Sequence, residues 1–208
     1  MPKPDLENAY ALGSLDDTKR LYAEWAEAYD QNFAEEMDFV LPGEVAKTYA
    51  ATGAMGPVLD FGCGTGLVGQ ALSGLGVTQI DGADLSPEML AVARRKGVYR
   101  HLIAGNVLDG YEPPQGPYAG IVSSGTFTNG HVGPEAIDEL LRLAAPGAQF
   151  ALSINGQHFS NAGFGAKFEA LSGRIQGLTL PELRFYGPGN TGPHKDDTGV
   201  IALFRKAP

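Results

Sequence analysis

Val58-Leu-Asp-Phe-Gly-Cys-Gly-Thr-Gly-Leu67 is the stretch of sequence that decides the fold. A short apolar run over Pro57 to Phe61 predicts a buried strand, and the apolar residues of Thr65 to Leu75 recur on one face of a predicted helix. The turn between this strand and this helix contains three glycines: Gly62, Gly64 and Gly66. Because glycine has no Cβ, such a turn can bring backbone N–H groups against a ligand at a helix N-terminus. The pattern therefore predicts a nucleotide-type site.

Two acidic residues accompany the glycine turn. Asp60 stands just before it, and Asp84 follows about 20 positions later, at the end of a second predicted strand over Gln79 to Leu85. In dinucleotide sites an acid in the place of Asp84 binds the ribose. However, the glycines are spaced Gly-x-Gly-x-Gly, and Asp60 would repel a pyrophosphate but attract an ammonium or sulfonium. Adenosine joined to a cationic amino acid fits better than a dinucleotide, and an NAD-dependent oxidoreductase with a related sheet remains the alternative.

With these two motifs the chain resembles the class I S-adenosyl-L-methionine (SAM) dependent methyltransferases, over nearly its whole length. Residues 58–66 are similar to the family's first motif, and Asp81-Gly-Ala-Asp-Leu-Ser-Pro-Glu-Met-Leu90 is similar to its second. The resemblance implies that SAM is the cofactor, that S-adenosyl-L-homocysteine (SAH) is the product, and that the methyl group passes to the acceptor by in-line displacement. It also implies an α/β, Rossmann-like fold: a seven-stranded, mostly parallel sheet with an antiparallel C-terminal hairpin and helices on both faces.

The resemblance further implies roles for individual residues. The backbone of the glycine turn would hold the methionine part, Asp84 the ribose, and Leu85 and Met89 one face of the adenine. The family usually has Asp after the third strand, whereas this chain has Asn106 followed by Val107. The side-chain oxygen of Asn can still accept a hydrogen bond from the adenine amino group. The carbonyl of Ser123, at the end of the fourth strand, is expected to bind the ammonium.

An aromatic stripe precedes the core, because Tyr22, Trp25 and Tyr29 recur at helical spacing. Such a stripe can dock a helix onto the core, and it can also form a lid whose rings cap a cation. Tyr22-Ala-Glu-Trp-Ala-Glu-Ala-Tyr-Asp30 resembles a signature that precedes the core in many small-molecule methyltransferases. We expect a helical lid over about 14–53 and a core over about 56–208, in one domain. The expected cofactor-binding residues are Tyr22, Trp25, Asp60, Gly62, Gly64, Gly66, Asp84, Leu85, Met89, Asn106, Val107 and Ser123.

The acceptor side has fewer signals. His131, in the loop after the fourth strand, is a candidate general base because the unperturbed pKa of histidine lies near neutrality. The alternative, which isolated motif matches favour, is a polar loop residue that caps the next helix. The stretch 130–134 resembles a loop of the methyltransferase-like proteins named for the Williams-Beuren region, which names no substrate. His158 and His194 are expected to be separate surface residues, since the histidine spacings match no metal-binding pattern. The Gly- and Asn-rich stretch 155–166 is expected to be a loop at the substrate rim.

Composition narrows the class of function. The 208 residues, 43% of them hydrophobic, suit one domain with one core. With 15 basic and 24 acidic residues the formal charge is −9, which disfavours nucleic acid and leaves a small-molecule acceptor as the expectation. A single cysteine, Cys63, argues against a disulfide or a Cys-rich metal site, and the sequence lacks a signal core or a membrane-length apolar run. We therefore expect a cytoplasmic enzyme without a metal or a membrane partner. A non-catalytic SAM-binding protein remains a second alternative.

Strands and helices are expected to alternate along the rest of the chain, which favours a parallel sheet with ligands at the carboxyl ends of the strands. The further expected helices cover 43–52, 87–96 and 135–145, and the further expected strands cover 99–104, 118–123, 150–154, 183–186 and 199–205.

Overall fold

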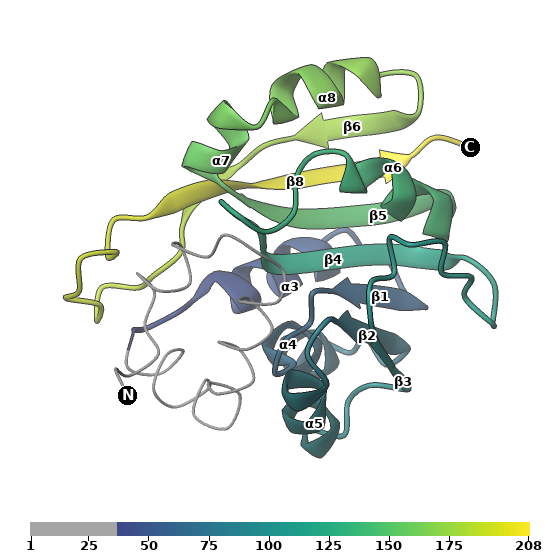
Figure 1. Cartoon of the computed structure of the whole chain (residues 1–208), viewed down its shortest axis with the longest axis horizontal. Helices are drawn as coiled ribbons and strands as arrows, with labels where there is room; N and C mark the ends of the chain where they lie inside the picture. The colour runs from purple at the N-terminus through teal and green to yellow at the C-terminus, as the bar shows by residue number, and fades with distance from the viewer. Residues whose placement is uncertain (1–36) are drawn as a thin grey trace.

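The computed structural model describes residues 37–208. Helices and strands alternate through most of this range (Figure 1). The helices are α3 (Leu41–Ala50), α4 (Leu67–Gly74), α5 (Pro87–Arg95), α6 (Ala136–Leu143), α7 (Gly156–Asn161) and α8 (Phe164–Ala170). The strands are β1 (Val58–Phe61), β2 (Ile80–Asp84), β3 (His101–Ala104), β4 (Tyr118–Phe127), β5 (Ala144–Asn155), β6 (Ile175–Thr179), β7 (Glu182–Arg184) and β8 (Thr198–Lys206).

The strands form one sheet in the order β3-β2-β1-β4-β5-β8-β6, and β7 also pairs with β8. Strands β1 to β5 are mutually parallel, whereas β8 runs antiparallel to β5, β6 and β7. The strand order reverses between β1 and β4, which lie side by side. In open α/β sheets ligands bind at this reversal, outside the carboxyl ends of the strands. The topology therefore places the end of β1, with its glycine turn, at the expected ligand-binding position.

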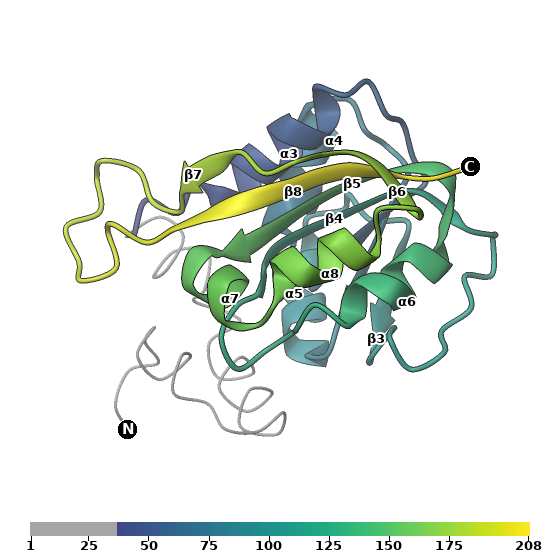
Figure 2. The ribbon, with the colours of Figure 1, turned by 90° about the horizontal axis from the view of Figure 1, so that it is seen from above.

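Helices cover both faces of the sheet, as Figure 2 shows from above. On one face α3 and α4 pack against the central strands through a buried cluster that includes Val45, Tyr49 and Leu72. On the other face α6 and α8 pack through a second cluster that includes Leu140, Phe164 and Phe168. These clusters pack β1 and β4 between two helical layers. No helix in residues 37–208 is both long and apolar enough to span a membrane.

The expected fold is confirmed, with differences at its C-terminal end. The sheet has eight strands rather than seven, because β6 and β7 both lie along the outer edge of β8, pairing with different parts of it. The stretch 155–166 is not a loop, since it contains α7 and the start of α8. Both helices pack through aromatic side chains: the ring of Phe164 contacts the rings of His158 and Phe159. Packing of these rings outweighs the local preference of glycine and asparagine for turns.

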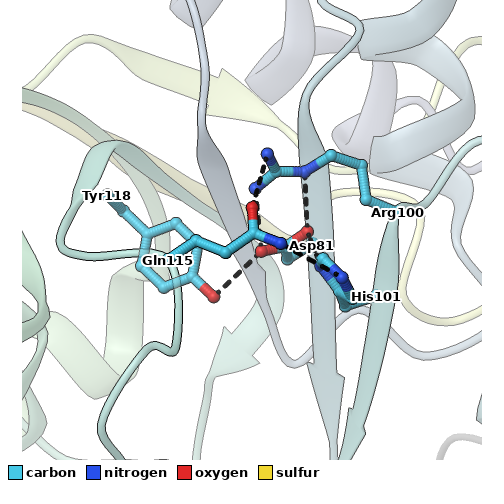
Figure 3. A network of polar contacts seen from close by, with 5 residues as sticks. All are labelled: Asp81, Arg100, His101, Gln115 and Tyr118. Atoms are coloured by element: carbon cyan, nitrogen blue, oxygen red, sulfur yellow. Dashed lines mark hydrogen bonds and ion pairs between the residues drawn. The ribbon is translucent and has the colours of Figure 1, made fainter.

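A polar network around the buried carboxylate of Asp81 ties together the strand ends opposite the glycine turn (Figure 3). Asp81 on β2 is 5% exposed and accepts both Nε and Nη2 of Arg100 at 3.0 Å. Tyr118 at the start of β4 donates to the same carboxylate at 3.2 Å, and Nδ1 of His101 lies 3.1 Å from it. Because these partners come from the start of β3 and the start of β4, the carboxylate on β2 fixes the relative positions of three strands.

Candidate functional site

A cavity of about 320 Å³ lies at the carboxyl ends of the central strands. Its wall is formed by the turn after β1, the start of α5, the residues after β3, the end of β4 and the segment that leads into α6. This volume lies at the lower end of the range for small-molecule sites. Three further wall residues, Phe39, Pro42 and Leu108, are apolar.

The glycine turn has the backbone that only glycine adopts readily. Gly62 and Gly64 have φ values of 68° and 52°. A Cβ at Gly62 would lie 2.1 Å from Oγ1 of Thr126, whereas a Cβ at Gly64 would meet nothing within 4 Å. Gly62 is therefore needed for a close approach to β4, and Gly64 presents bare backbone to the open cavity. The turn leads into α4, whose N-terminus has no side-chain cap, so its N–H groups and positive dipole end remain suited to a polar ligand.

Asp84 closes one side of the turn. Its Oδ2 accepts the backbone N–H of Gly64 at 2.8 Å, and its Oδ1 accepts the backbone N–H of Ser86 at 2.9 Å. The side chain lines the cavity, and each oxygen of a carboxylate has a second lone pair for a ligand hydroxyl. Burial raises the pKa of Asp84 above 3.8, and the hydrogen bonds from Ser86 and Gly64 oppose this rise.

Asp60 lies beneath the turn rather than in the cavity wall. The residue is 0% exposed, and its Oδ2 accepts the hydroxyl of Tyr99 at 2.7 Å. Burial raises the pKa of Asp60 from 3.8 to about 7, with a further contribution from the charge of Asp84, while the bond from Tyr99 lowers it. Its carboxyl is thus poised between its charged and neutral forms near neutral pH.

The wall beyond Asp84 is mainly apolar. Leu85, Met89 and Val107 line it, together with Asn106. The side-chain oxygen of Asn106 accepts the backbone N–H of Leu108 at 3.1 Å, which leaves that oxygen one lone pair for a ligand. An apolar wall with one polar group at its edge suits a heteroaromatic ring.

His131 lines the opposite part of the cavity, next to Val132. Burial lowers the pKa of His131 below 6.5, and the nearby His158 lowers it further. His158 is therefore not a separate surface residue as expected: its Nε2 lies 2.8 Å from the carbonyl oxygen of Val132, and α7 brings it against this loop. Within residues 37–208 no group of three or more His, Cys, Asp or Glu is placed to hold a metal ion.

Most of the expected site residues within the described range meet at this cavity. Its lining includes Gly62, Gly64, Asp84, Leu85, Met89, Asn106, Val107 and His131. Asp60 and Gly66 support the turn from outside the lining, and Tyr22 and Trp25 lie outside the described residues.

At the end of β4 the side chains of neighbouring serines have different surroundings, and the expected role of the Ser123 carbonyl stays a prediction. Ser123 is fully buried, and its hydroxyl donates to the carbonyl of Phe61 at 2.7 Å, so its side chain ties β4 to β1. Ser124 lines the cavity, and its buried hydroxyl has no hydrogen-bond partner in residues 37–208. Alternation along a strand could have indicated this, because neighbouring side chains point to opposite faces. Thr126 and Glu135 also line the cavity, without a motif that marks them.

Comparisons with known proteins agree with this geometry. The profile of a family described as "Methyltransferase domain" matches residues 58–147, which include both motifs and the start of the acceptor side. Methyltransferase-like protein 27 of Homo sapiens is 31% identical over 176 residues, covering 81% of this chain and 69% of that protein. Ribosomal RNA small subunit methyltransferase C of Ectopseudomonas mendocina is 38% identical over 97 residues, which cover 43% of this chain but 28% of that protein.

Two solved structures share the fold over most of their length. The complex of DhpI with SAH has a TM-score of 0.66 at 18% identity and covers 94% of this chain and 98% of its own. The N-methyltransferase NodS from Bradyrhizobium japonicum with SAH has a TM-score of 0.61 at 16% identity and covers 89% and 98%. Together with the identity to methyltransferase-like protein 27, the glycine turn and Asp84 show that this chain belongs to the class I SAM-dependent methyltransferases, with SAM as its cofactor.

Proposed function

We propose that this methyltransferase acts on a small, neutral or cationic molecule, with His131 as the general base where the acceptor must lose a proton. The observation that carries the proposal is the composition of the cavity wall. From the residues that fit the cofactor, the cavity continues to Ser124, His131 and Glu135, and no Lys or Arg of the described chain lines it. An anionic acceptor would find no complementary charge among the lining residues of 37–208.

The cofactor side of the proposal assigns a role to each residue. The N–H groups of the glycine turn would bind the methionine part, Asp84 the ribose hydroxyls, and Leu85 and Met89 one face of the adenine. Asn106 would meet the adenine edge. These roles fit the open backbone at Gly64 and the position of the Asp84 carboxylate in the cavity wall.

Methyl transfer from SAM requires few catalytic groups from the protein. When bound, SAM supplies a methyl group that its sulfonium already activates. The chain must hold the acceptor lone pair in line with that methyl group and exclude water. As the new bond to the acceptor forms and the carbon–sulfur bond breaks, the proton of an N–H, O–H or S–H acceptor passes to the neutral imidazole of His131. The lowered pKa keeps this imidazole unprotonated at neutral pH.

A nucleic-acid substrate fits less well, even though one of the relatives methylates ribosomal RNA according to its name. The matched segment covers 28% of that relative, and this chain has a formal charge of −9. Phosphate backbones require basic surfaces for binding. The single-domain organisation and the cytoplasmic location expected from the sequence remain predictions.

The test is methyl transfer from isotopically labelled SAM to an extract of the source organism, separated into small-molecule, RNA and protein fractions. We expect label in the small-molecule fraction, on a product without a carboxylate or phosphate. Label confined to RNA or protein would contradict the proposal, and SAM binding without any transfer would favour a non-catalytic binding protein. His131→Gln should abolish transfer to a protic acceptor while SAM still binds, and His194→Gln in the β7–β8 loop serves as the matched control.

A further inference from the structure

Tyr99 occupies the space directly beneath the glycine turn. It lies between α5 and β3, and its ring approaches three backbone segments at glycines. A Cβ at Gly69 in α4 would lie 2.3 Å from the phenol oxygen, one at Gly66 would lie 2.9 Å from the ring, and one at Gly82 on β2 would lie 3.0 Å from it. The bare backbone at all three places is therefore needed to admit this ring. Tyr99 therefore packs beneath the glycine turn and supports it.

The hydroxyl of Tyr99 makes the one side-chain hydrogen bond that Asp60 receives from residues 37–208, at 2.7 Å. The other groups that face Asp60 are a like charge, a neutral thiol and one backbone N–H donor. Asp84 on β2 raises its pKa by like charge, Cys63 on the turn is a thiol whose own pKa is raised well above 9.0 by burial, and the backbone N–H of Gly69 on α4 lowers the pKa of Asp60. Tyr99 is thus the side chain that favours a charged carboxylate at a position where burial disfavours it.

We propose that Tyr99 is a positioning residue that holds Asp60 as a carboxylate beneath the glycine turn, so that the site binds the sulfonium of SAM in preference to the uncharged thioether of SAH. SAM and SAH share their adenosine and amino acid parts, so the difference between them is the methyl group and the positive charge on sulfur. A buried anion acts over several ångströms through a medium of low dielectric and needs no direct contact. Once the methyl group has left, this attraction disappears, which favours release of the product.

The test compares Tyr99→Phe with the unchanged protein, because phenylalanine keeps the ring that packs beneath the glycine turn and removes only the hydroxyl. The dissociation constants of SAM and of SAH are measured by calorimetry between about pH 5.5 and about pH 9. In the unchanged protein we expect the preference for SAM over SAH to rise with pH through about 7, as Asp60 ionises. In Tyr99→Phe the preference at pH 7 should fall about tenfold, equivalent to about 1.4 kcal/mol, and should be regained in part at high pH.

Asp60→Asn provides an independent measurement if the tyrosine variant folds poorly. The proposal expects this variant to bind SAM with a weak preference that does not change with pH. If Tyr99→Phe weakened the affinities for SAM and SAH by equal factors at every pH, or changed neither affinity, the proposal would be overturned. Tyr99 would then be merely a packing residue. A steep pH dependence of the preference retained in Asp60→Asn would also overturn the proposal, because the titrating group would then be another one.

Discussion

Replacing Asp84 by alanine tests whether this carboxylate binds the ribose of SAM. The carboxylate accepts two backbone N–H groups, from Gly64 and Ser86, and faces the cavity. Alanine removes the acceptor for the ligand and also leaves both N–H groups without their partner, so the turn loses its support. A hydrogen bond to a charged group contributes about 1.5–3 kcal/mol. We therefore expect a loss of about 1–3 kcal/mol in SAM binding, which corresponds to a dissociation constant raised by roughly 5- to 150-fold.

Isothermal titration calorimetry with SAM and with SAH measures this loss, and both ligands should weaken alike because they share the ribose. Asp109→Ala is the matched control: Asp109 is an exposed acid shortly after β3 and does not line the cavity. Its replacement should leave both affinities unchanged. Unchanged affinity in Asp84→Ala, or a loss of similar size in Asp109→Ala, would refute the assignment of the ribose to Asp84.

Three further predictions concern stability. Asp81→Asn should lower the free energy of unfolding by about 1.5–3 kcal/mol, because it weakens the charged hydrogen bonds to a buried carboxylate. Asp138→Asn, at a half-exposed pair, should cost about 1 kcal/mol or less. Chemical denaturation compares the two variants, and similar losses would contradict the structural role of the network. Without ligand, the free energy of unfolding should fall as the pH rises from about 4 to about 7, since folded Asp60 retains a proton that the unfolded chain releases. Asp60→Asn should flatten this pH dependence. An unchanged pH dependence in the variant would argue against the raised pKa of Asp60. Gly62→Ala should destabilise the fold by at least about 1 kcal/mol through its positive φ, and the clash with Thr126 should add to this loss. In thermal melts, adding Thr126→Ala should relieve only the loss that the clash causes. A fully stable Gly62→Ala variant would show that the turn tolerates a Cβ.

The cofactor half of the site could be predicted because its signals are local in sequence. The glycine turn and the second-strand acid lie within one strand–helix–strand unit, so their spacing determines where they meet. The start of α5 was equally readable: the hydroxyl of Ser86 caps the helix by accepting the N–H of Met89 at 3.2 Å, and Pro87 follows as the first helical residue.

The features that sequence reasoning missed depend on contacts between distant segments. Tyr99 meets Asp60 across 39 positions, and no short pattern marks a tyrosine that will pack under glycines. The sequence does not predict helices α7 and α8, because their glycines and asparagines are typical of turns. Phe164 and Phe168 nevertheless stand at helical spacing and are buried. Their stability comes from packing onto β5 and β8 rather than from local propensity.

The most direct test of the account is calorimetric titration of the purified protein with SAM, SAH and NAD under the same conditions. A turn of bare backbone between two acids should accept the sulfur nucleosides and reject a pyrophosphate. We predict saturable binding of SAM and SAH at one site per chain, and no measurable binding of NAD. Binding of NAD in the absence of SAM binding would contradict the central claim.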